Sequence, residues 1–533
     1  MTSSVNSSPL PAEPVRKRWI AAALPPLFAM VLPIGQLAAN RSLISSWWLI
    51  LTAPLVAAAI GWTLAAVCWL AIRAPWQRSL VATALVLTFF GFGHLQNLAG
   101  DNSRFSTPLL LWLWIGGGLS LAYWLRAWPA QRAEHVCRWG VLLTCFALVL
   151  QVGTLALGLS KDTSLLPTKD EPARRLASGD RPDIYYLVLD AYGRQDVLAE
   201  LYSFDNEPFL RELEKRGFTV SRQARSNYNQ TALSLASSLN LDYLDRLIEV
   251  SPRLESRLPL QLLIMDSVVD RQLRAAGYRT ISLATGYSYT QRRRSDRFVP
   301  LTPWDEFDEC QLALADATIL GPLLRDRSLR AHEARVRGGL AAIPDLAARE
   351  AGPKFVMAHI VCPHPPFVFD GQGKSVWQTR TLADGNHLVG PYFSRERYRR
   401  CYGEQLRFVN SRVLATIDGI LAKSARPPII VLQADHGPAS ELVVESPDES
   451  NVVERFGILS AIYTPPALGL KFADDHSPVN TFRLVLNAVC GTNYERLPSR
   501  CYFGLWKRPF ELTDVTDRVR RGGAAEGRHL ARD

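Results

Sequence analysis

Two hydrophobic patterns divide the chain near residue 160. Before that point, apolar residues form five long stretches, each close to the roughly 20 residues that a membrane-spanning helix needs. After it, short apolar runs alternate with amphipathic stretches, which is typical of a mostly parallel sheet covered by helices on both faces. We therefore predict an α-helical membrane domain of five spans followed by an α/β domain. The predicted spans cover residues 19–39, 47–72, 80–99, 108–125 and 139–159.

The same shifts in composition set the predicted domain limits. A Ser/Pro-rich start predicts a disordered N-terminus over residues 1–18, ahead of the spans at 19–159. A charged stretch predicts a polar linker at 160–181. The α/β domain is expected at 182–517, followed by a disordered tail at 518–533.

The basic residues beside the spans predict the orientation of the chain. Lys and Arg accumulate in cytoplasmic loops close to membrane spans. With the N-terminus inside, eight basic residues are cytoplasmic and only two lie in short outer loops. Five crossings then place everything after residue 159 outside the membrane. The eight are Arg16, Lys17, Arg18, Arg73, Arg78, Arg126, Arg132 and Arg138, and the two are Arg41 and Arg104.

Within the α/β domain, strands and helices alternate. Buried parallel strands read as continuous apolar runs, and amphipathic stretches that end in Gly predict helices. The predicted strands are 184–189, 278–283, 355–361, 429–433 and 458–463. The predicted helices are 209–217, 231–239, 267–276 and 397–422.

Polar side chains follow two of these strands directly. Asp190 comes after the strand at 184–189, and Asp435 and His436 follow the strand at 429–433. Ligands bind beyond the carboxyl ends of strands in open α/β sheets, and carboxylates with an imidazole suit one divalent cation. Zinc is favoured, with manganese or magnesium as alternatives. The structural alternatives are a turn role for Asp190 and a buried Asp435–His436 hydrogen bond.

Thr231 is the candidate nucleophile. It stands where the polar stretch from Ser226 turns into an amphipathic helix, and a helix N-terminus attracts anions such as phosphate. A hydroxyl there that also meets a metal can ionise and attack phosphorus. The alternative is a helix N-cap, for which Thr is common. His359, within the strand at 355–361, is interpreted as a core histidine.

Four ordered motifs resemble the sulfatase-like branch of the alkaline phosphatase superfamily. They are Asp190-Ala-Tyr-Gly, Asn227-Tyr-Asn-Gln-Thr-Ala-Leu-Ser, Pro363-His-Pro-Pro-Phe and Ala434-Asp-His-Gly-Pro. The resemblance covers roughly residues 182–517 and is nearest to lipid A phosphoethanolamine transferases and lipoteichoic acid synthases. Those proteins also have five spans followed by an extracytoplasmic catalytic domain.

The resemblance implies an alkaline-phosphatase-like fold with one divalent metal. It also implies a multi-pass protein of the bacterial inner membrane, with a cytoplasmic N-terminus and a periplasmic catalytic domain. The implied metal ligands are Asp190, Thr231, Asp435 and His436, and Thr231 is the residue that becomes covalently modified.

Three further residues are implied to meet the substrate. His364 corresponds to a histidine that contacts the substrate phosphate or protonates the leaving group, and is a second catalytic residue. Asn227, which opens the threonine motif, and His476, a later histidine, are expected to bind substrate.

The chain also departs from its relatives' patterns. The phosphoethanolamine transferases usually carry Glu where Asp190 stands, and several disulfides. True sulfatases convert a Cys or Ser within Cys/Ser-x-Pro-x-Arg into formylglycine, and no such motif occurs here. Sulfate-ester hydrolysis is therefore disfavoured. Among the few cysteines, Cys490 and Cys501 are the expected local disulfide pair.

The net charge of +10 does not indicate nucleic acid, because the basic residues are scattered or flank the spans. The cluster at 292–294 with Arg297 either binds anionic headgroups or forms a solvated loop.

The predicted function is a membrane-anchored, metal-dependent phosphotransferase that moves a phosphate-linked headgroup from a membrane phospholipid to an envelope glycan or lipid. A phosphodiesterase or phosphatase is the first alternative, since water can replace the acceptor. A non-catalytic membrane binding or assembly protein is the alternative of another class. The sequence does not indicate the oligomeric state.

Overall fold

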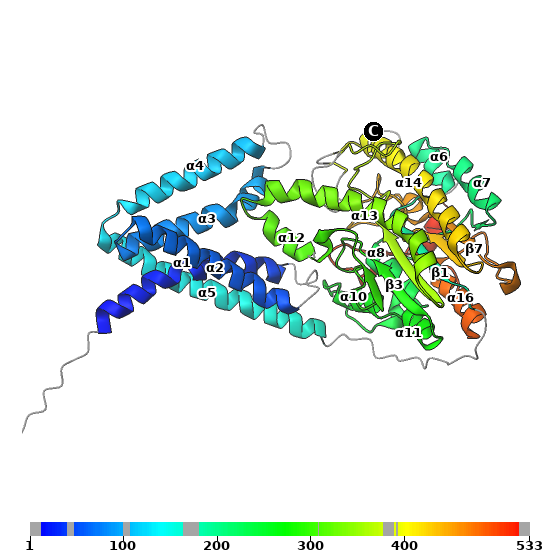
Figure 1. Ribbon diagram of the computed structural model, residues 1–533, viewed down its shortest axis with the longest axis horizontal. Coiled ribbons are helices and arrows are strands. Elements are labelled where there is room, and N and C mark those ends of the chain that lie inside the picture. The colour runs from blue at the N-terminus through cyan, green and yellow to red at the C-terminus, as the bar shows by residue number, and fades with distance from the viewer. Residues whose placement is uncertain are drawn as a thin grey trace, which may run out of the picture. The chain divides into compact units, whose positions relative to one another are not determined.

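The computed structural model describes residues 12–39, 47–99, 107–163, 181–306, 309–376, 389–390 and 393–521 (Figure 1). The chain forms two compact units. The helical unit contains Met1–Lys161 together with Cys310–Leu324, and the α/β unit contains the remaining residues. The predicted N-terminal segment, linker and tail lie largely outside the described residues. The described parts of these segments are helical at 12–18, 160–163 and 518–521, whereas Arg181 lies outside any helix.

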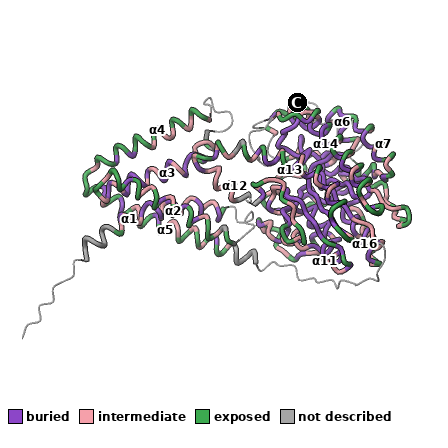
Figure 2. The backbone as a smooth tube through the Cα atoms, viewed as in Figure 1, coloured by how far each residue is buried: buried purple, intermediate pink, exposed green. Residues whose placement is uncertain are grey.

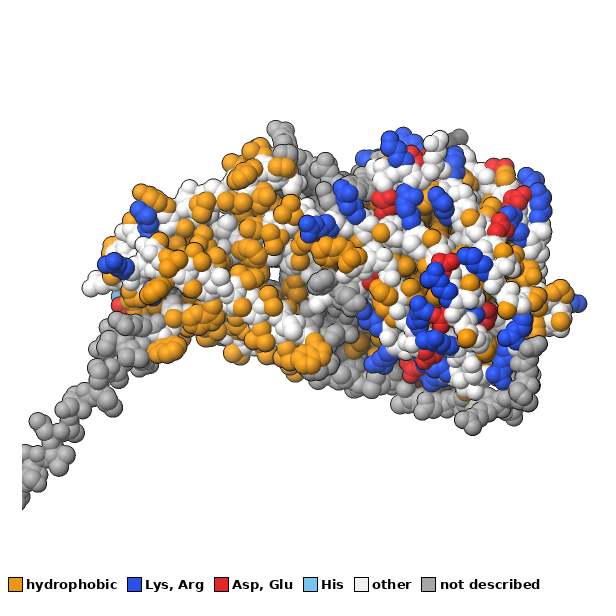
Figure 3. Space-filling view, in the orientation of Figure 1, with side chains coloured by type: hydrophobic (Ala, Val, Ile, Leu, Met, Phe, Trp, Pro, Cys, Tyr) orange, Lys and Arg blue, Asp and Glu red, His pale blue; other side chains and the backbone are white. Residues whose placement is uncertain are grey.

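Five apolar helices make up most of the helical unit. Each contains a stretch long and apolar enough to cross a membrane. Many of their large apolar side chains are exposed, including Trp112 and Val149, and orange side chains gather over this unit in Figure 3. An outward-facing apolar surface is what a helix presents to lipid. The helices are α1 (Ala12–Ala39), α2 (Trp47–Ala71), α3 (Pro75–Ala99), α4 (Thr107–Arg126) and α5 (Ala130–Thr163).

A segment from the second half of the sequence also belongs to the helical unit. It contains α12 (Glu309–Asp316) and the start of α13 (Gly321–Arg349). The backbone N–H of Gly93 in α3 donates to the carbonyl of Ala317 at 3.0 Å, and the N–H of Ile319 donates to the carbonyl of Phe89 at 2.8 Å. The apolar pattern of the sequence did not predict this insertion.

A seven-stranded mixed sheet organises the α/β unit, with the order β2-β7-β6-β1-β5-β3-β4. The five strands from β6 to β4 are parallel, while β7 is antiparallel to both β6 and β2. This confirms the predicted mostly parallel sheet. The strands are β1 (Ile184–Leu189), β2 (Thr219–Val220), β3 (Arg279–Leu283), β4 (Arg297–Val299), β5 (Lys354–Ile360), β6 (Ile429–Gln433) and β7 (Ser460–Tyr463).

Helices cover both faces of this sheet, and Figure 2 shows the buried interior. Side chains of β1 alternate between two core clusters, because successive strand residues point to opposite faces. The cluster on one face contains Tyr185, Leu187 and Leu189, which pack with α6, α7, α13 and α14. The cluster on the other face contains Ile184, Tyr186 and Val188, which pack with α8, α10, α11 and α16. The helices are α6 (Gln195–Tyr202), α7 (Glu207–Lys215), α8 (Thr231–Leu239), α9 (Leu244–Leu247), α10 (Leu258–Met265), α11 (Val268–Ala275), α14 (Arg395–Lys423), α15 (Val452–Phe456), α16 (Thr481–Cys490) and α17 (Thr516–Arg521), and a small hairpin joins β8 (Tyr502–Gly504) to β9 (Leu512–Asp514).

The expected disulfide between Cys490 and Cys501 is wrong. Both thiols are free and buried. Cys490 packs in the core beneath the large sheet, whereas Cys501 packs with Phe456 and Phe503 in a separate cluster. Nearness in sequence does not bring these two side chains together.

Candidate active site

Three neighbouring strands deliver the candidate site residues to one edge of the sheet. Val188 of β1 is in register with Gln433 of β6. Asp190 and Asp435 therefore both lie two residues beyond paired positions. On the other side, β1 pairs with β5, which carries His359 opposite Val188.

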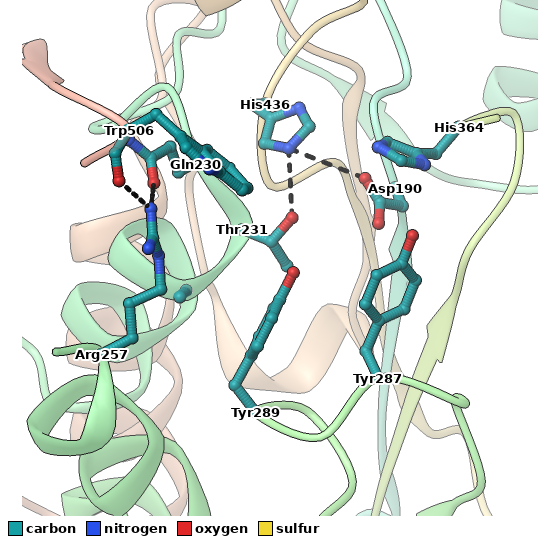
Figure 4. A pocket seen from close by; sticks show the side chains of 10 residues that line it. Asp190, Gln230, Thr231, Arg257, Tyr287, Tyr289, His364, His436 and Trp506 are labelled. Atoms are coloured by element: carbon teal, nitrogen blue, oxygen red, sulfur yellow. Dashed lines mark hydrogen bonds and ion pairs between the residues drawn. The ribbon is translucent and has the colours of Figure 1, made fainter. Parts of the chain in front are cut away.

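Thr231 enters this edge from the start of α8, as Figure 4 shows. Its hydroxyl oxygen lies 3.1 Å from Nε2 of His436. The same nitrogen lies 3.4 Å from Asp435 Oδ2 and 3.7 Å from Asp190 Oδ1. All four side chains are buried. The structure thus brings together the complete predicted set of metal ligands.

The capping alternative for Thr231 does not hold. Gln230 occupies the N-cap position of α8 and makes no side-chain capping bond, and Thr231 is the first helical residue. The side chain of Gln230 is instead directed to the carbonyl of Gly504, at 2.7 Å. The N-terminus of α8 keeps the N–H groups and the positive dipole end that favour an anion.

The backbone around Asp435 orients its carboxylate. Oδ1 accepts hydrogen bonds from the N–H of Ala191 at 3.1 Å and of His436 at 2.9 Å. Gly437 is needed because a Cβ there would lie 2.1 Å from the carbonyl oxygen of Glu454. The Asp-His-Gly sequence therefore combines two functional side chains with a turn that only glycine fits.

The buried donor set fits a divalent cation. Ligand atoms of Asp190, His359 and Asp435 all lie within 4.8 Å of one another. Asp190 Oδ1 and Asp435 Oδ2 are buried without a hydrogen-bond partner. Unpartnered buried carboxylate oxygens are costly unless a cation compensates them. Two carboxylates and an imidazole are ligands that zinc accepts.

His359 belongs to this group of side chains, although the sequence suggested a core histidine. Its Nε2 lies 3.2 Å from Asp190 Oδ2, and its Nδ1 lies 3.2 Å from the hydroxyl of Thr290. His359 is therefore positioned to orient Asp190 or to contribute a ligand atom itself.

The electrostatics favour a charged Asp190 and a neutral His436. Burial alone would raise the pKa of Asp190, but His364, His359 and His436 outweigh burial and hold this pKa below its ordinary value. Burial, followed by the Arg455 guanidinium, lowers the pKa of His436 to about 4. A carboxylate and a neutral imidazole are the protonation states that bind metal.

Arg455 joins the two loops that carry Thr231 and His436. The side chain of Arg455 is buried, with 1% of its surface exposed. Its Nε donates to the carbonyl of Asn229 at 2.8 Å, and its Nη1 donates to the carbonyl of Gly437 at 2.9 Å. Its Nη2 lies 3.2 Å from His436 Nε2. In addition, Nδ1 of His436 lies 3.0 Å from the Gly437 carbonyl, so that an Nδ1–H there directs the Nε2 lone pair into the site.

A cavity opens over Thr231. It is lined by Asp190, Gln230, Thr231, Ala232, Arg257, Tyr287, Tyr289, His364, His436 and Trp506.

Comparison with known proteins places this site in a family. The family model described as Sulfatase matches residues 182–457, which is more than half of the chain. The chain belongs to the sulfatase family. This agrees with the resemblance to the alkaline phosphatase superfamily that the four motifs indicated.

Several solved structures are similar to this sulfatase-family chain. The C-terminal periplasmic domain of EcEptC from Escherichia coli, in complex with Zn, is 14% identical, covers 66% of this chain and 98% of its own, and has a TM-score of 0.42. The lipooligosaccharide phosphoethanolamine transferase A from Neisseria meningitidis is 14% identical over 88% of this chain and 95% of its own, with a TM-score of 0.37. The phosphonate monoester hydrolase of Agrobacterium radiobacter is 11% identical over 61% and 80%, with a TM-score of 0.37. The search of curated proteins found no match.

His364 reaches the sulfatase-family pocket from the loop after β5. Its Nδ1 lies 2.5 Å from the carbonyl oxygen of Pro365. If Nδ1 carries the proton that bonds to this carbonyl, Nε2 is the ring nitrogen that can accept or donate a proton. Its ring centroid lies 6.4 Å from that of His436. His364 and His436 therefore both line the pocket at Thr231.

The structure does not bring Asn227 and His476 into the lining of the cavity. The Asn227 amide donates to Ser477 Oγ at 2.7 Å, and its carbonyl oxygen accepts from the N–H of Val479 at 2.9 Å. Nε2 of His476 lies 2.8 Å from the hydroxyl of Thr481, and its side chain is buried. Both residues hold together the loop that precedes α16.

Sequence reasoning missed part of the cavity wall, and misjudged one arginine. The missed residues are Arg257, Tyr287, Tyr289 and Trp506, which lie in loops without a recognisable motif. Arg292 belongs neither to a solvated loop nor to a headgroup site. It is buried, pairs with Asp270, and donates from Nε to the carbonyl of Ile264 at 3.1 Å.

Proposed function

We propose that this protein is a membrane-anchored, metal-dependent phosphotransferase. It moves a phosphate-linked headgroup from a membrane phospholipid to an envelope glycan or lipid, through a threonine intermediate. The observation that carries this proposal is the hydroxyl of Thr231, 3.1 Å from His436 Nε2 and beside two buried carboxylates with unpartnered oxygens.

Asp190, Thr231, Asp435 and His436 would hold the metal, which supplies positive charge that favours the ionised Thr231 hydroxyl and the phosphate. Zinc is favoured for a mixed nitrogen and oxygen set, with manganese or magnesium as alternatives. The N-terminus of α8 attracts the same phosphate through its free N–H groups.

The first transfer step forms one bond and breaks one. Thr231 Oγ1 bonds to phosphorus and its proton leaves to solvent, while the bond from phosphorus to the diacylglycerol oxygen breaks. His364, in its protonated form, gives that oxygen a proton. The products are diacylglycerol and a phosphodiester of Thr231 that carries the headgroup.

The second step reverses these roles. Neutral His364 removes a proton from an acceptor hydroxyl, whose oxygen bonds to phosphorus. The bond from phosphorus to Thr231 Oγ1 breaks, and Thr231 recovers a proton. With water as the acceptor, the same residues would perform diester hydrolysis.

Membrane anchoring supports transfer from a lipid, since it holds the donor at high effective concentration. The excess of basic residues on one side of the five helices supports a cytoplasmic N-terminus and a periplasmic catalytic unit in the bacterial inner membrane. The missing Cys/Ser-x-Pro-x-Arg motif speaks against sulfate-ester hydrolysis. The unpartnered carboxylate oxygens speak against a purely structural role.

Release of diacylglycerol from bacterial phospholipids by the full-length protein tests the proposal. Thr231→Ala should reduce release at least about 1,000-fold, as expected for loss of a nucleophile. Thr231→Ser, which keeps a hydroxyl, should retain part of the activity. Thr219→Ala, on the exposed edge strand β2, is the matched control and should behave as wild type. Unchanged release by Thr231→Ala would overturn the proposal.

A further inference from the structure

The cavity above Thr231 has a second side that the transfer chemistry does not use. Figure 4 shows Arg257, Gln230 and Trp506 on one side of Thr231, and Asp190 and His364 on the other. The phosphate would lie over Thr231. A group attached to that phosphate and directed away from Asp190 would therefore meet the side that Arg257 forms.

Arg257 is held in place from two parts of the chain. It precedes α10 at the N-cap position. Its Nη2 donates to Gln230 Oε1 at 3.0 Å and to the carbonyl of Trp506 at 2.6 Å. Its guanidinium carbon lies 4.4 Å from the centroid of the Trp506 ring. The charge is thus fixed beside the residue that directly precedes Thr231.

The charges of the lining are unequal on the two sides. Asp190 is the one carboxylate among the ten lining residues, and it belongs to the metal group. Arg257 is the one Arg or Lys among them. Trp506 and Gln230 beside Arg257 add an indole and an amide, and Tyr289, below Thr231 in Figure 4, adds a phenol.

This wall is unsuited to an ammonium headgroup. Arg257, Trp506, Tyr289 and Gln230 offer no carboxylate that could pair with an ammonium ion. The guanidinium of Arg257 already lies against the Trp506 ring and repels a second cation. Hydroxyl oxygens, in contrast, accept hydrogen bonds from a guanidinium and from a phenol, and their carbon chain packs against aromatic rings.

We propose that Arg257, Trp506 and Tyr289 form a headgroup subsite that selects a hydroxylated, non-cationic headgroup of the glycerol class over an aminoalcohol. The subsite rests on the proposed phosphotransferase function, and it names the substrate class of the same site. Arg257 is its specificity-determining residue, because it supplies the charge that separates the two headgroup classes.

Vesicles of two compositions test this subsite with the full-length protein. One contains phosphatidylglycerol and the other phosphatidylethanolamine in the same neutral lipid, and diacylglycerol release is measured by mass spectrometry. Wild type should use phosphatidylglycerol at least tenfold faster. Arg257→Glu should lose at least tenfold on phosphatidylglycerol and should lower or reverse the preference. Arg253→Glu makes the same charge change at an exposed position nearby and should keep the wild-type preference.

A diester without a hydroxylated headgroup separates headgroup recognition from catalysis. In Arg257→Ala, turnover of bis(p-nitrophenyl) phosphate should fall less than turnover of phosphatidylglycerol, because a nitrophenyl group lacks the hydroxyl groups that Arg257 would bind. An equal loss on this diester and on phosphatidylglycerol would show that Arg257 only positions Gln230 and Thr231, and would overturn the subsite. Equal or faster use of phosphatidylethanolamine by wild type would overturn it as well, and so would release from neither lipid.

The result that would overturn the proposed phosphotransferase function differs from the result that would overturn the subsite. If Thr231→Ala still releases diacylglycerol at the wild-type rate, the phosphotransferase proposal fails, whichever headgroup is preferred. If Thr231→Ala is inactive and phosphatidylethanolamine is preferred, only the subsite fails.

Discussion

The hydroxyl of Thr231 lies 3.1 Å from Nε2 of His436, although 205 positions separate the two residues. One residue opens a helix and the other follows a strand, and the carboxyl edge of the sheet brings them together. Because Asp190 and Asp435 meet at the same edge, the hydroxyl lies beside concentrated negative charge. Such a hydroxyl becomes a nucleophile only when a cation compensates that charge.

Metal removal should destabilise the wild-type protein. Bound metal stabilises the folded state by about 4 kcal/mol when its free concentration is roughly 1,000 times its dissociation constant. A chelator should therefore lower the melting temperature of wild type and should have little effect on Asp435→Asn, which binds the metal weakly. An identical response of the two proteins to the chelator would contradict this metal site.

Gly437→Ala should destabilise the α/β unit by about 3 kcal/mol or more, because overpacking against backbone cannot be relieved by rotating a side chain. A Cβ at this position would lie 2.1 Å from the carbonyl oxygen of Glu454. Gly338→Ala in α13 is the control, since its Cβ would make ordinary contact with Leu301 at 3.7 Å. That variant should be neutral or more stable by up to about 1 kcal/mol. Thermal unfolding of both variants checks the difference.

Gly93→Val should disrupt the contact between α3 and the inserted segment of the helical unit. A Cβ at Gly93 would lie 2.6 Å from the Cα of Ala317. We expect faster hydrogen exchange at the amide of Ile319, which donates to Phe89 in the wild-type protein. Gly117→Val, with nothing within 4 Å of its Cβ, should leave that exchange rate unchanged. Equal exchange in the two variants would contradict the packing.

His476 should make the folded state less stable in acid. Burial, followed by Arg496, lowers the pKa of His476 from 6.5 to about 3. Its contribution to stability is complete above pH 6.5 and is lost as the pH falls toward 3, since the unfolded chain binds the proton more readily. Between pH 7 and pH 5 the loss is about 2 kcal/mol. His476→Gln should show a correspondingly smaller loss in unfolding measurements at the two pH values, and an unchanged loss would contradict this origin.

The sequence predicted which side chains meet at the carboxyl edge of the sheet because local signals and fold rules agreed there. The apolar runs at Ile184–Leu189 and Ile429–Gln433 are buried strands with the predicted bounds. Thr231 begins α8 as predicted. Residues that directly follow parallel strands must meet at one edge of the sheet. The position of Asp190, Asp435 and His436 therefore follows from the strand pattern.

The side of the cavity formed by Arg257 and Trp506 could not be predicted in this way. Arg257 reaches Trp506 across 249 positions, and neither residue follows a strand or opens a motif. For Arg292 the error is the opposite, because a buried residue was expected to be exposed. Three consecutive arginines suggest an exposed cluster, but Arg292 pairs with the buried Asp270, which is 22 positions away in the sequence. The long helix α13 was also missed, since Gly338, Gly339 and Pro344 interrupt its pattern. Tertiary packing decides all three cases.

The most direct test of the central claim is the mass of the peptide that contains Thr231. The full-length protein is incubated with bacterial phospholipids without an acceptor, quenched in acid and digested. Thr231 should carry a mass increment equal to a phosphate-linked headgroup, and the increment should be absent from Thr231→Ala and from protein treated with a chelator. Continued lipid turnover with an unmodified Thr231 peptide, at a rate that Thr231→Ala does not change, would contradict the account.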